Sequence, residues 1–428
     1  MLKRSFLGWS KPRIKNLTIG DIHRPPETIA VPETVTLLIE KPDVSTGPPL
    51  VQPGEAVQSG QKLVLFEQAD TYATAPVTGQ VTRVTTRAGD FGKNYVEICI
   101  AAEDADQADE AWAAACSDGP TLETLTGYLA NVPGKPGLEA LQNPEKPIHK
   151  IVVNGSDADL LVATRQYQVK NQADDIHHGI GILKEATGID DIVICLTQDV
   201  VQNIGHLGAE PVGVNNEYPG TLPLMIMKDS LDMEVPAGDA CEDLGVFFIS
   251  AEAVASIGRA FTQKAIPTEK TITVVDKAGA VRLYKTTIGT PLTAVFAAVG
   301  VELQEGDRII SGGPMTGAAV YTDEFPIMPD TDAIIVQGGA DIPLMSDYPC
   351  INCGDCIPIC PARIQVNMLV RFLEAGQYQD AADLYDLFSC VECGLCTFVC
   401  PAKIPIFQYI KLAKYELARL ESAEAANE

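Results

Sequence analysis

The sequence predicts an α+β protein of several domains, in which β-rich modules come first and a helical domain comes last. Its 428 residues suffice for about two to four domains, and a hydrophobic content of 46% is enough to give each domain a core. Short runs rich in Val, Thr and Ile, broken by Pro and Gly, fill residues 30–102 and indicate strands. Strand and helix patterns alternate from residue 147, and helical periodicity dominates after residue 361.

The β-rich segment 30–102 contains two stretches, 51–63 and 75–81, that resemble the flattened barrel sandwich of lipoyl and biotinyl carrier domains. We expect turns at Gly54, Gly60 and Gly79, and a core that includes Val57, Leu63 and Val81. A carrier domain needs a lysine at its hairpin tip, and the tip expected at residues 67–73 has none. The segment is therefore predicted to be a structural module that carries no lipoyl group.

The middle of the chain predicts two further units. Residues 147–265 should form a Rossmann-like α/β domain, with buried strands at Ile151–Val153 and Ile192–Leu196 and a helix at Ile176–Thr187. Residues 266–335 should form a β-grasp module. Its expected elements are a hairpin of Thr271–Val275 and Val281–Thr287, a helix at Pro291–Val299, and strands at Ile309–Gly313 and Met315–Ala319. Residues 103–146, which begin with an acidic stretch, are expected to link these units to the barrel sandwich.

Eight of the 12 cysteines form one repeated pattern between residues 350 and 401. Each copy reads C-x-x-C-x-x-C-x-x-x-C-P, the run that binds [4Fe–4S] clusters in bacterial ferredoxins. Three thiolates on a tight loop bind one cube, and the fourth, expected at the start of the next helix, reaches the other cube. The prediction is two [4Fe–4S] clusters. One would be held by Cys350, Cys353, Cys356 and Cys400, and the other by Cys390, Cys393, Cys396 and Cys360.

Other uses of these cysteines fit the spacing poorly. Zinc sites use pairs of Cys-x-x-Cys, not triplets that end in Cys-Pro. A disulfide framework does not fit either, because the other four cysteines are scattered along the chain. The domain 336–428 should be helical, with helices at Val366–Ala375, Ala381–Phe388 and Ile406–Leu420. Its apolar residues would form a dry shell around the clusters, comprising Leu369, Phe372, Leu384, Leu387 and Phe388.

The charge and hydropathy of the chain argue against some classes of function. The formal net charge of −26 argues against nucleic-acid binding, and no apolar run is long enough to span a bilayer. The start of the chain lacks the features of a signal peptide, and iron–sulfur ligation suits the reducing cytoplasm. Residues 1–29 begin with five cations and no acid up to residue 15, namely Lys3, Arg4, Lys11, Arg13 and Lys15. We expect this segment to be a flexible tail or a first strand packed on the body of the protein, with docking on an anionic membrane surface as the alternative.

The order of these modules resembles the RnfC family, from the Rnf ion-translocating electron-transport complex, over nearly the whole chain. The matching stretches are 75–79, 234–238, 288–292, 312–317, both cysteine runs, and 403–405. Cobalamin reductases of bacterial microcompartments share the plan, as does, in part, the complex I subunit that binds FMN and NADH. The resemblance implies a complex I flavin-subunit-like α/β domain and a soluble-ligand-binding β-grasp module.

One departure from the family concerns the flavin port. The family carries a glycine-rich loop before the first α/β strand, which lets backbone approach the phosphates of flavin and nicotinamide. Here the corresponding residues 125–137 lack the glycine cluster and contain prolines. The acidic segment that would contact flavin is reduced, so that Asn154, Gly155 and Asp157 are its residual positions. We therefore expect neither FMN nor NAD to bind, and the NADH site to be lost.

The resemblance implies an iron–sulfur electron-transfer subunit of a membrane-associated, Rnf-like ion-translocating oxidoreductase complex. It would relay single electrons between a soluble donor, a ferredoxin or a flavoprotein, and the membrane flavin subunits. No catalytic acid or base is expected, and the protein would lie in the cytoplasm, peripheral on the inner face of the cell membrane. Two alternatives remain open: a soluble flavin or corrinoid (cobalamin) reductase-like protein, and a non-redox scaffold with structural clusters.

Overall fold

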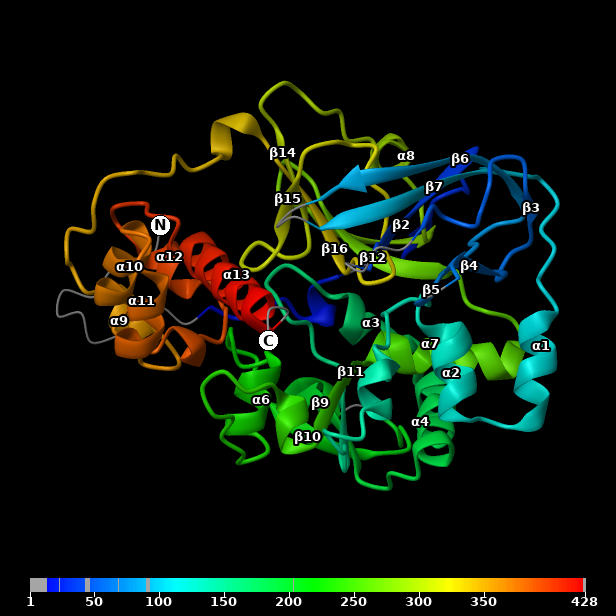
Figure 1. Ribbon diagram of the computed structural model, residues 1–428, viewed down its shortest axis with the longest axis horizontal. Helices are drawn as coiled ribbons and strands as arrows, with labels where there is room; N and C mark the ends of the chain where they lie inside the picture. The colour runs from blue at the N-terminus through cyan, green and yellow to red at the C-terminus, as the bar shows by residue number, and fades with distance from the viewer. Residues whose placement is uncertain are drawn as a thin grey trace.

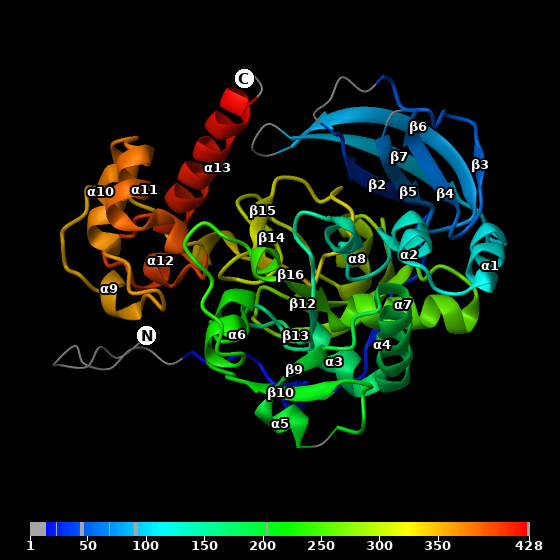
Figure 2. The same ribbon diagram turned by 60° about the horizontal axis from the view of Figure 1, so that its bottom comes forward.

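The computed structural model describes residues 14–22, 24–42, 47–67, 69–89, 93–202 and 204–425. The helical domain and the barrel sandwich lie at opposite ends of the molecule, and the two other sheets lie between them (Figures 1 and 2). Of the five N-terminal cations, only Lys15 falls within the described residues, so the alternative of a membrane contact by the first residues lies outside them. In the part of the chain that the structure describes, no helix has both the length and the apolar character needed to cross a membrane.

The first module is a four-stranded antiparallel sheet with a hairpin packed on it. The sheet has the order β2-β7-β6-β3, formed by β2 (Thr34–Glu40), β7 (Asn94–Ala102), β6 (Gly79–Ala88) and β3 (Ala56–Val57), and the hairpin is β4 (Lys62–Phe66) with β5 (Ala69–Thr74). Val57, Leu63 and Val81 are buried as predicted. The expectation of a turn at Gly79 is wrong. Gly79 starts β6, where a Cβ would lie 1.9 Å from the carbonyl oxygen of Ala101 on the neighbouring strand.

The α/β domain is built on four parallel strands in the order β10-β9-β8-β11. The strands are β8 (Lys150–Asn154), β9 (Ile192–Thr197), β10 (Glu210–Val214) and β11 (Val246–Ser250). All six residues of β9 are buried, as expected of a parallel strand covered on both faces. Its helices are α3 (Thr164–Asn171), α4 (Ala173–Thr187), α5 (Gln198–Val201), α6 (Pro223–Asp229) and α7 (Ala251–Gln263), and α1 (Ala111–Ala115) and α2 (Leu122–Leu129) precede the sheet.

The third module is a six-stranded mixed sheet in the order β1-β13-β12-β16-β14-β15. Its strands are β1 (Glu27–Thr28), β12 (Glu269–Val275), β13 (Val281–Thr287), β14 (Arg308–Ser311), β15 (Ala318–Val320) and β16 (Ala333–Gln337), and its helix is α8 (Leu292–Val299). The predicted hairpin and helix are confirmed. The strand predicted at Met315–Ala319 exists as β15 but starts only at Ala318, because residues 312–317 form a turn that starts with Gly312 at φ 98°. β1, from the N-terminal segment, extends this sheet by pairing in parallel with β13.

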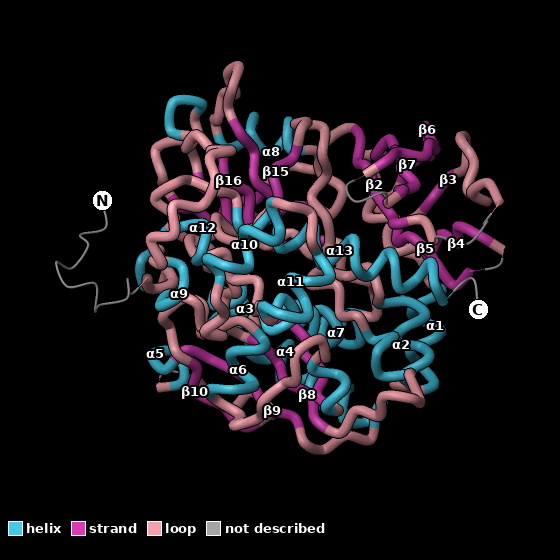
Figure 3. The backbone as a smooth tube through the Cα atoms, turned by 60° about the vertical axis from the view of Figure 1, so that its left-hand side comes forward, coloured by secondary structure: helices cyan, strands magenta, loops and turns pink. Residues whose placement is uncertain are grey.

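The C-terminal domain contains five helices within the described residues (Figure 3). They are α9 (Cys356–Ile359), α10 (Val366–Glu374), α11 (Tyr378–Tyr385), α12 (Leu395–Val399) and α13 (Ile406–Ala425). Leu369 and Leu387 are fully buried in its core, as expected of a shell around the cysteines. The same expectation is wrong for Leu384 and Phe388, which are 64% and 38% exposed.

Candidate iron–sulfur centre

The two cysteine runs have the same backbone conformation. Three pairs of equivalent residues share positive φ angles: Asn352 and Glu392 at 56°, Gly354 and Gly394 at 79° and 70°, and Arg363 and Lys403 at 58° and 60°. The fourth cysteine of each run donates its backbone N–H three residues back, from Cys360 to Ile357 and from Cys400 to Thr397, both at 3.2 Å. The sequence repeat is thus a repeat in three dimensions.

The position of the fourth cysteine differs from the prediction. Cys360 and Cys400 each end a short helix, α9 and α12, with extended backbone. The long helices α10 and α13 begin only six residues later. The extended backbone at the fourth position, followed by proline, ends the short helix and turns the chain toward the other cysteine run.

Cys356 lies among three other cysteines from both runs. Burial, and after it negative charge on Cys350, Cys353 and Cys400, raises the pKa of its thiol to about 12. The same four residues line one small pocket. The structure therefore brings Cys400 of the second run to the first loop, as the ferredoxin rule requires.

The remaining four cysteines form a matching group. Burial, and after it negative charge on Cys390 and Cys360, raises the pKa of Cys393 to about 12. The pKa of Cys396 is raised mainly by burial as well, and then by charge on Cys390, Cys393 and Cys360. Cys360 of the first run thus lies with the second loop, and the two groups exchange their fourth members.

The thiols of the second group also receive backbone hydrogen bonds. Glu392 N lies 3.4 Å from Cys390 Sγ, and backbone N–H groups of Leu395 and Thr397 lower the pKa values of Cys393 and Cys396. Such donors stabilise sulfur that carries negative charge. A buried thiolate also needs a cation, and bound iron supplies it, because a coordinating thiol is deprotonated outright. The residues present therefore fit an iron–sulfur cluster.

A single metal ion fits these positions less well. Among the described residues, no three His, Cys, Asp or Glu side chains lie close enough together to hold one ion. Thiolates that bind a cube each hold a different iron, so they stand further apart than the ligands of one ion. This geometry argues against zinc at the two groups.

The two groups differ in their surroundings. Cys353 of the first group is exposed, whereas the other seven cysteines of the two runs are buried or half-buried. The second group packs against the α/β domain and the β-grasp module through Tyr218, Leu160 and Met315. Tyr218 donates its hydroxyl to the carbonyl oxygen of Cys393 at 2.8 Å. Sequence reasoning missed this role of Tyr218, since no neighbouring residue marks a cluster contact.

The three residual flavin positions lie in the interior of the α/β domain. Asn154 and Asp157 are 4% and 1% exposed. Asn154 bonds to Thr221 and Ser156, and Asp157 accepts hydrogen bonds from the start of α3. Gly155 is needed for close packing, because a Cβ there would lie 2.6 Å from Leu196. The polar atoms named here are used within the protein.

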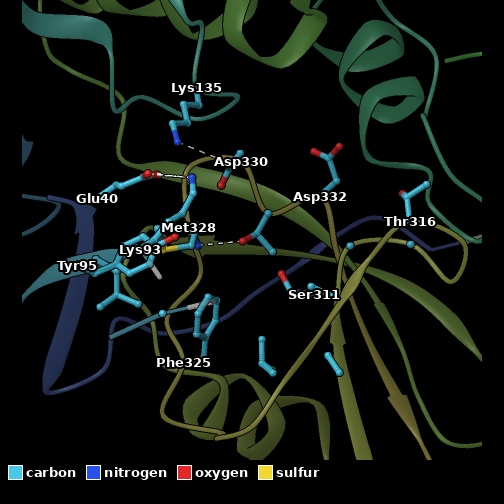
Figure 4. Close-up of a pocket in the computed structure, with 18 of the residues that line it drawn as sticks. Glu40, Lys93, Tyr95, Lys135, Ser311, Thr316, Phe325, Met328, Asp330 and Asp332 are labelled. Carbon is cyan, nitrogen blue, oxygen red and sulfur yellow. Dashed lines mark hydrogen bonds and ion pairs between the residues drawn. The ribbon is translucent and has the colours of Figure 1, made fainter. Parts of the chain in front are cut away.

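A cavity of about 570 Å³, which the sequence did not indicate, lies between the first three modules (Figure 4). Each of its three lining cations within the described chain faces a carboxylate. Lys93 Nζ lies 2.8 Å from Glu40, and Lys135 Nζ lies 3.7 Å from Asp330, as Figure 4 shows. The third, Arg87, lies 3.3 Å from Glu97. An anionic ligand would have to compete with these carboxylates.

Asp159, at one wall of the cavity, connects it to the cysteine domain. It accepts hydrogen bonds from the backbone of Met315 and Thr316 and from the Thr316 hydroxyl, at 2.7 to 3.2 Å. Met315 in turn contacts the second cysteine loop at Gly394, where a Cβ would lie 2.7 Å from the Met315 carbonyl oxygen. The Gly312-Gly313 pair was the sequence signal for this close approach, since a Cβ at Gly313 would lie 2.2 Å from Asp159.

Comparison with known proteins gives one family model and several relatives. The model for a 4Fe-4S dicluster domain matches residues 349–404. The RnfC protein of the proton-translocating ferredoxin:NAD(+) oxidoreductase complex of Clostridium ljungdahlii is 25% identical over 92% of this chain and 90% of its own length. The RnfC protein of the ion-translocating oxidoreductase complex of Yersinia pestis is 26% identical over 88% of this chain and 64% of its own length.

Two further similar proteins are matched over a smaller share of their own length. The RnfC protein from Rhodobacter capsulatus is 28% identical over 64% of this chain and 54% of its own length, so the chain spans less than two thirds of the Yersinia and Rhodobacter relatives. An NAD⁺-reducing [NiFe]-hydrogenase structure aligns with a TM-score of 0.46 at 10% identity, over 71% of this chain and 62% of that one. Over most of its length, this chain is a homologue of the RnfC proteins of ion-translocating oxidoreductase complexes.

Proposed function

We propose that this chain is the iron–sulfur electron-transfer subunit of an ion-translocating, membrane-associated oxidoreductase complex. The observation that carries the proposal is the pair of four-cysteine groups, each completed by a cysteine from the other run. It would be held peripherally on the cytoplasmic face by integral subunits and exchange electrons with a ferredoxin or a flavoprotein. The named homologues, subunits of such complexes, support this assignment.

Two [4Fe–4S] clusters are proposed, bound by the two cysteine groups. One is assigned to Cys350, Cys353, Cys356 and Cys400, and the other to Cys390, Cys393, Cys396 and Cys360. When bound, each cluster accepts and releases one electron at a time. The chain holds the thiolates apart at fixed positions, directs backbone N–H groups at them and excludes water with the shell around Leu369 and Leu387. Lys414 of α13 fixes the second loop through the Cys390 carbonyl oxygen at 3.0 Å.

The ligand assignment is tested by replacing one thiol from the first group. Cys353→Ala should remove about four of about eight irons per chain and leave the second cluster's spectrum in place. Cys116→Ala is the matched control, because Cys116 is a half-buried thiol outside both groups. Iron and acid-labile sulfide should be unchanged in the control. Full iron content in Cys353→Ala would contradict the assignment.

We also propose that the binding site for flavin and nicotinamide is lost. Support comes from the buried, internally bonded Asn154 and Asp157 and from the carboxylates that face the cavity cations. A soluble flavin or corrinoid reductase is the second candidate function, and the 570 Å³ cavity, which is large enough for a cofactor, favours it. Purified protein with reconstituted clusters should release no FMN and should not oxidise NADH. Stoichiometric flavin with NADH turnover would select the reductase instead.

Assembly into a membrane complex has its own test. A tagged full-length chain, expressed in its source organism and purified in mild detergent, should copurify with integral membrane subunits. Its clusters should be intact in the same preparation by absorbance and iron content. A cluster-loaded chain that purifies alone would contradict the proposed function.

A further inference from the structure

Four large apolar side chains are exposed within eight residues before and inside the first cysteine loop. Leu344, Met345, Tyr348 and Ile351, called here the apolar strip, are 88%, 48%, 75% and 64% exposed. Single exposed apolar residues are ordinary, but four large ones within one eight-residue segment mark a surface that another molecule covers. Folding alone gives no reason to leave them in water, since burying large apolar side chains stabilises a protein.

The apolar strip lies beside the first cysteine group. Ser346, inside the strip, donates its backbone N–H to the carbonyl oxygen of Lys403 at 3.0 Å, which holds the strip against the residues that follow Cys400. Ile351 lies between two ligand positions in sequence and lines the same pocket as the four thiols. The exposed Cys353 follows two residues later. A partner seated on the strip would therefore lie close to the first cluster.

The second cysteine group offers no comparable access. Tyr218, Leu160, Leu222 and Met315 pack against it from the neighbouring domains. Because electron transfer slows steeply with distance, a partner exchanges electrons with the cluster that comes nearest the surface. Cys353 of the first group is exposed, whereas every thiol of the second group is buried or half-buried. The electron exchanged with a partner therefore passes through the first cluster.

We propose that the apolar strip is the docking face for a redox protein that is held in the membrane. The partner would carry a one-electron centre, iron–sulfur or flavin, near an apolar surface with a basic rim. A single electron passes between that centre and the first cluster, so one is oxidised as the other is reduced, and no bond is formed or broken. This inference rests on the proposed function and adds the surface and the chemistry of the partner.

Charge selects this occupant over a lipid surface. Asp347 lies within the strip and Asp341 precedes it, and both are exposed. No Lys, Arg or His occurs between Gly338 and Cys350, and Lys403, whose backbone holds Ser346, is an exposed cation beside the strip. The whole chain has a formal charge of −26. An anionic bilayer would be repelled by such a segment, whereas a basic rim on a protein would be attracted.

Full-length, cluster-loaded protein provides the test. The strip variant combines Leu344→Ser with Tyr348→Ser. The matched control combines Leu384→Ser with Leu420→Ser. It removes two leucines of the same domain that lie outside the strip and are 64% and 52% exposed. Iron content and EPR signals should equal those of the wild type in both. The probe is membrane vesicles prepared from a strain of the source organism that lacks this chain. The readout is the equilibrium binding of the purified protein to these vesicles, measured by sedimentation.

Wild type and control should bind these vesicles with equal Kd, and the strip variant should bind at least about 10-fold more weakly, about 1.4 kcal/mol. Rising salt should weaken wild-type binding. Equal binding of the strip variant would overturn the inference and leave the proposed function standing. The inference would also be overturned if the wild type bound equally well to protein-free liposomes of phosphatidylcholine and phosphatidylglycerol. It would be overturned as well if the strip variant lost only the self-association of this chain. No binding of cluster-loaded wild type would overturn both.

A second readout tests the order of the clusters. A water-soluble dysprosium chelate shortens the EPR relaxation of paramagnetic centres near the surface. It should act more strongly on the cluster that Cys353→Ala removes, and the vesicles should protect that cluster from the chelate. A stronger effect on the other cluster, or no protection, would contradict the assignment of the docking face.

Discussion

Asp157 is a carboxylate held in the interior of the α/β domain. Its oxygens accept hydrogen bonds from Arg165 N at 2.8 Å and from the Gln166 side chain at 2.8 Å, so it caps the first turn of α3. Burial raises its pKa to about 6 despite these bonds. The ionised form is therefore less stable in the folded protein than in the unfolded chain, where the ordinary pKa is 3.8.

This carboxylate predicts a particular pH dependence of stability. A raised folded pKa contributes stability below the unfolded pKa, and that contribution is lost as pH rises through about 6. Between pH 5 and pH 7, the stability of the wild type relative to Asp157→Asn should fall by about 1.4 kcal/mol. Thermal unfolding of both proteins across this range measures it. Parallel pH profiles would show that Asp157 does not titrate there.

Lys270 and Glu252 form a second buried charged site, which joins the β-grasp module to α7. The side chains are 0% and 2% exposed, with Lys270 Nζ 2.7 Å from Glu252 Oε2 and 2.9 Å from the Pro329 carbonyl oxygen. Lys270→Met should cost about 3–5 kcal/mol, because it leaves a buried carboxylate without its cation. The double variant Lys270→Met/Glu252→Met should recover most of the loss. Equal destabilisation in the two variants, measured by urea unfolding, would contradict this explanation.

At the scale of elements, helices α4 and α7 pack with their backbones in close contact at two glycines. A Cβ at Gly179 would lie 2.1 Å from the Val254 carbonyl oxygen, and one at Gly258 would lie 2.0 Å from the Asp175 carbonyl oxygen. Gly181, two residues along α4, has no neighbouring atom within 4 Å of a Cβ. The two α4 glycines therefore have different roles in one helix.

This difference makes a matched pair of substitutions. Gly179→Ala should destabilise the protein by about 1–3 kcal/mol, because the added methyl group pushes the helices apart. Gly181→Ala should stabilise it by about 0.5–1 kcal/mol through helix propensity alone. Chemical denaturation of the two variants measures both effects. The same sign for both would mean that α4 and α7 do not pack this closely.

Elements with strong periodicity or a continuous apolar run could be predicted from the sequence. Ile151–Val153 and Ile192–Leu196 are parallel strands because every residue in them can be buried on both faces. The turn at residues 312–317 was missed because the carboxylate that organises it, Asp159, is distant in sequence. The local sequence pattern carries no information about hydrogen bonds between residues that are distant in sequence.

The whole molecule places the cysteine domain against the α/β and β-grasp units, away from the barrel sandwich (Figure 2). The cysteine spacing predicted which thiols group together, because the loop geometry is local and repeated. It could not predict which group faces the neighbouring domains, because that depends on Tyr218 and Met315 from other domains. The cavity was missed for the same reason, since three modules contribute to its walls.

Tyr218 links domain packing to the second cysteine group and gives a prediction at this scale. Its hydroxyl donates to the Cys393 carbonyl oxygen, which favours additional negative charge nearby. Tyr218→Phe keeps the ring and removes the donor. The midpoint potential of one cluster should become more negative by up to about 60 mV, and the other should be unchanged. Spectroscopic redox titration measures both, and equal shifts of the two clusters would contradict a local effect.

The central claim is that eight thiolates hold two redox-active [4Fe–4S] clusters in this chain. An EPR-monitored redox titration of the full-length, reconstituted protein tests it most directly, with iron and acid-labile sulfide measured on the same sample. We expect about eight irons per chain and two centres that are reduced and reoxidised reversibly. Iron for one cluster or fewer, or clusters that cannot be reduced reversibly, would contradict the claim, the second result favouring a scaffold with structural clusters.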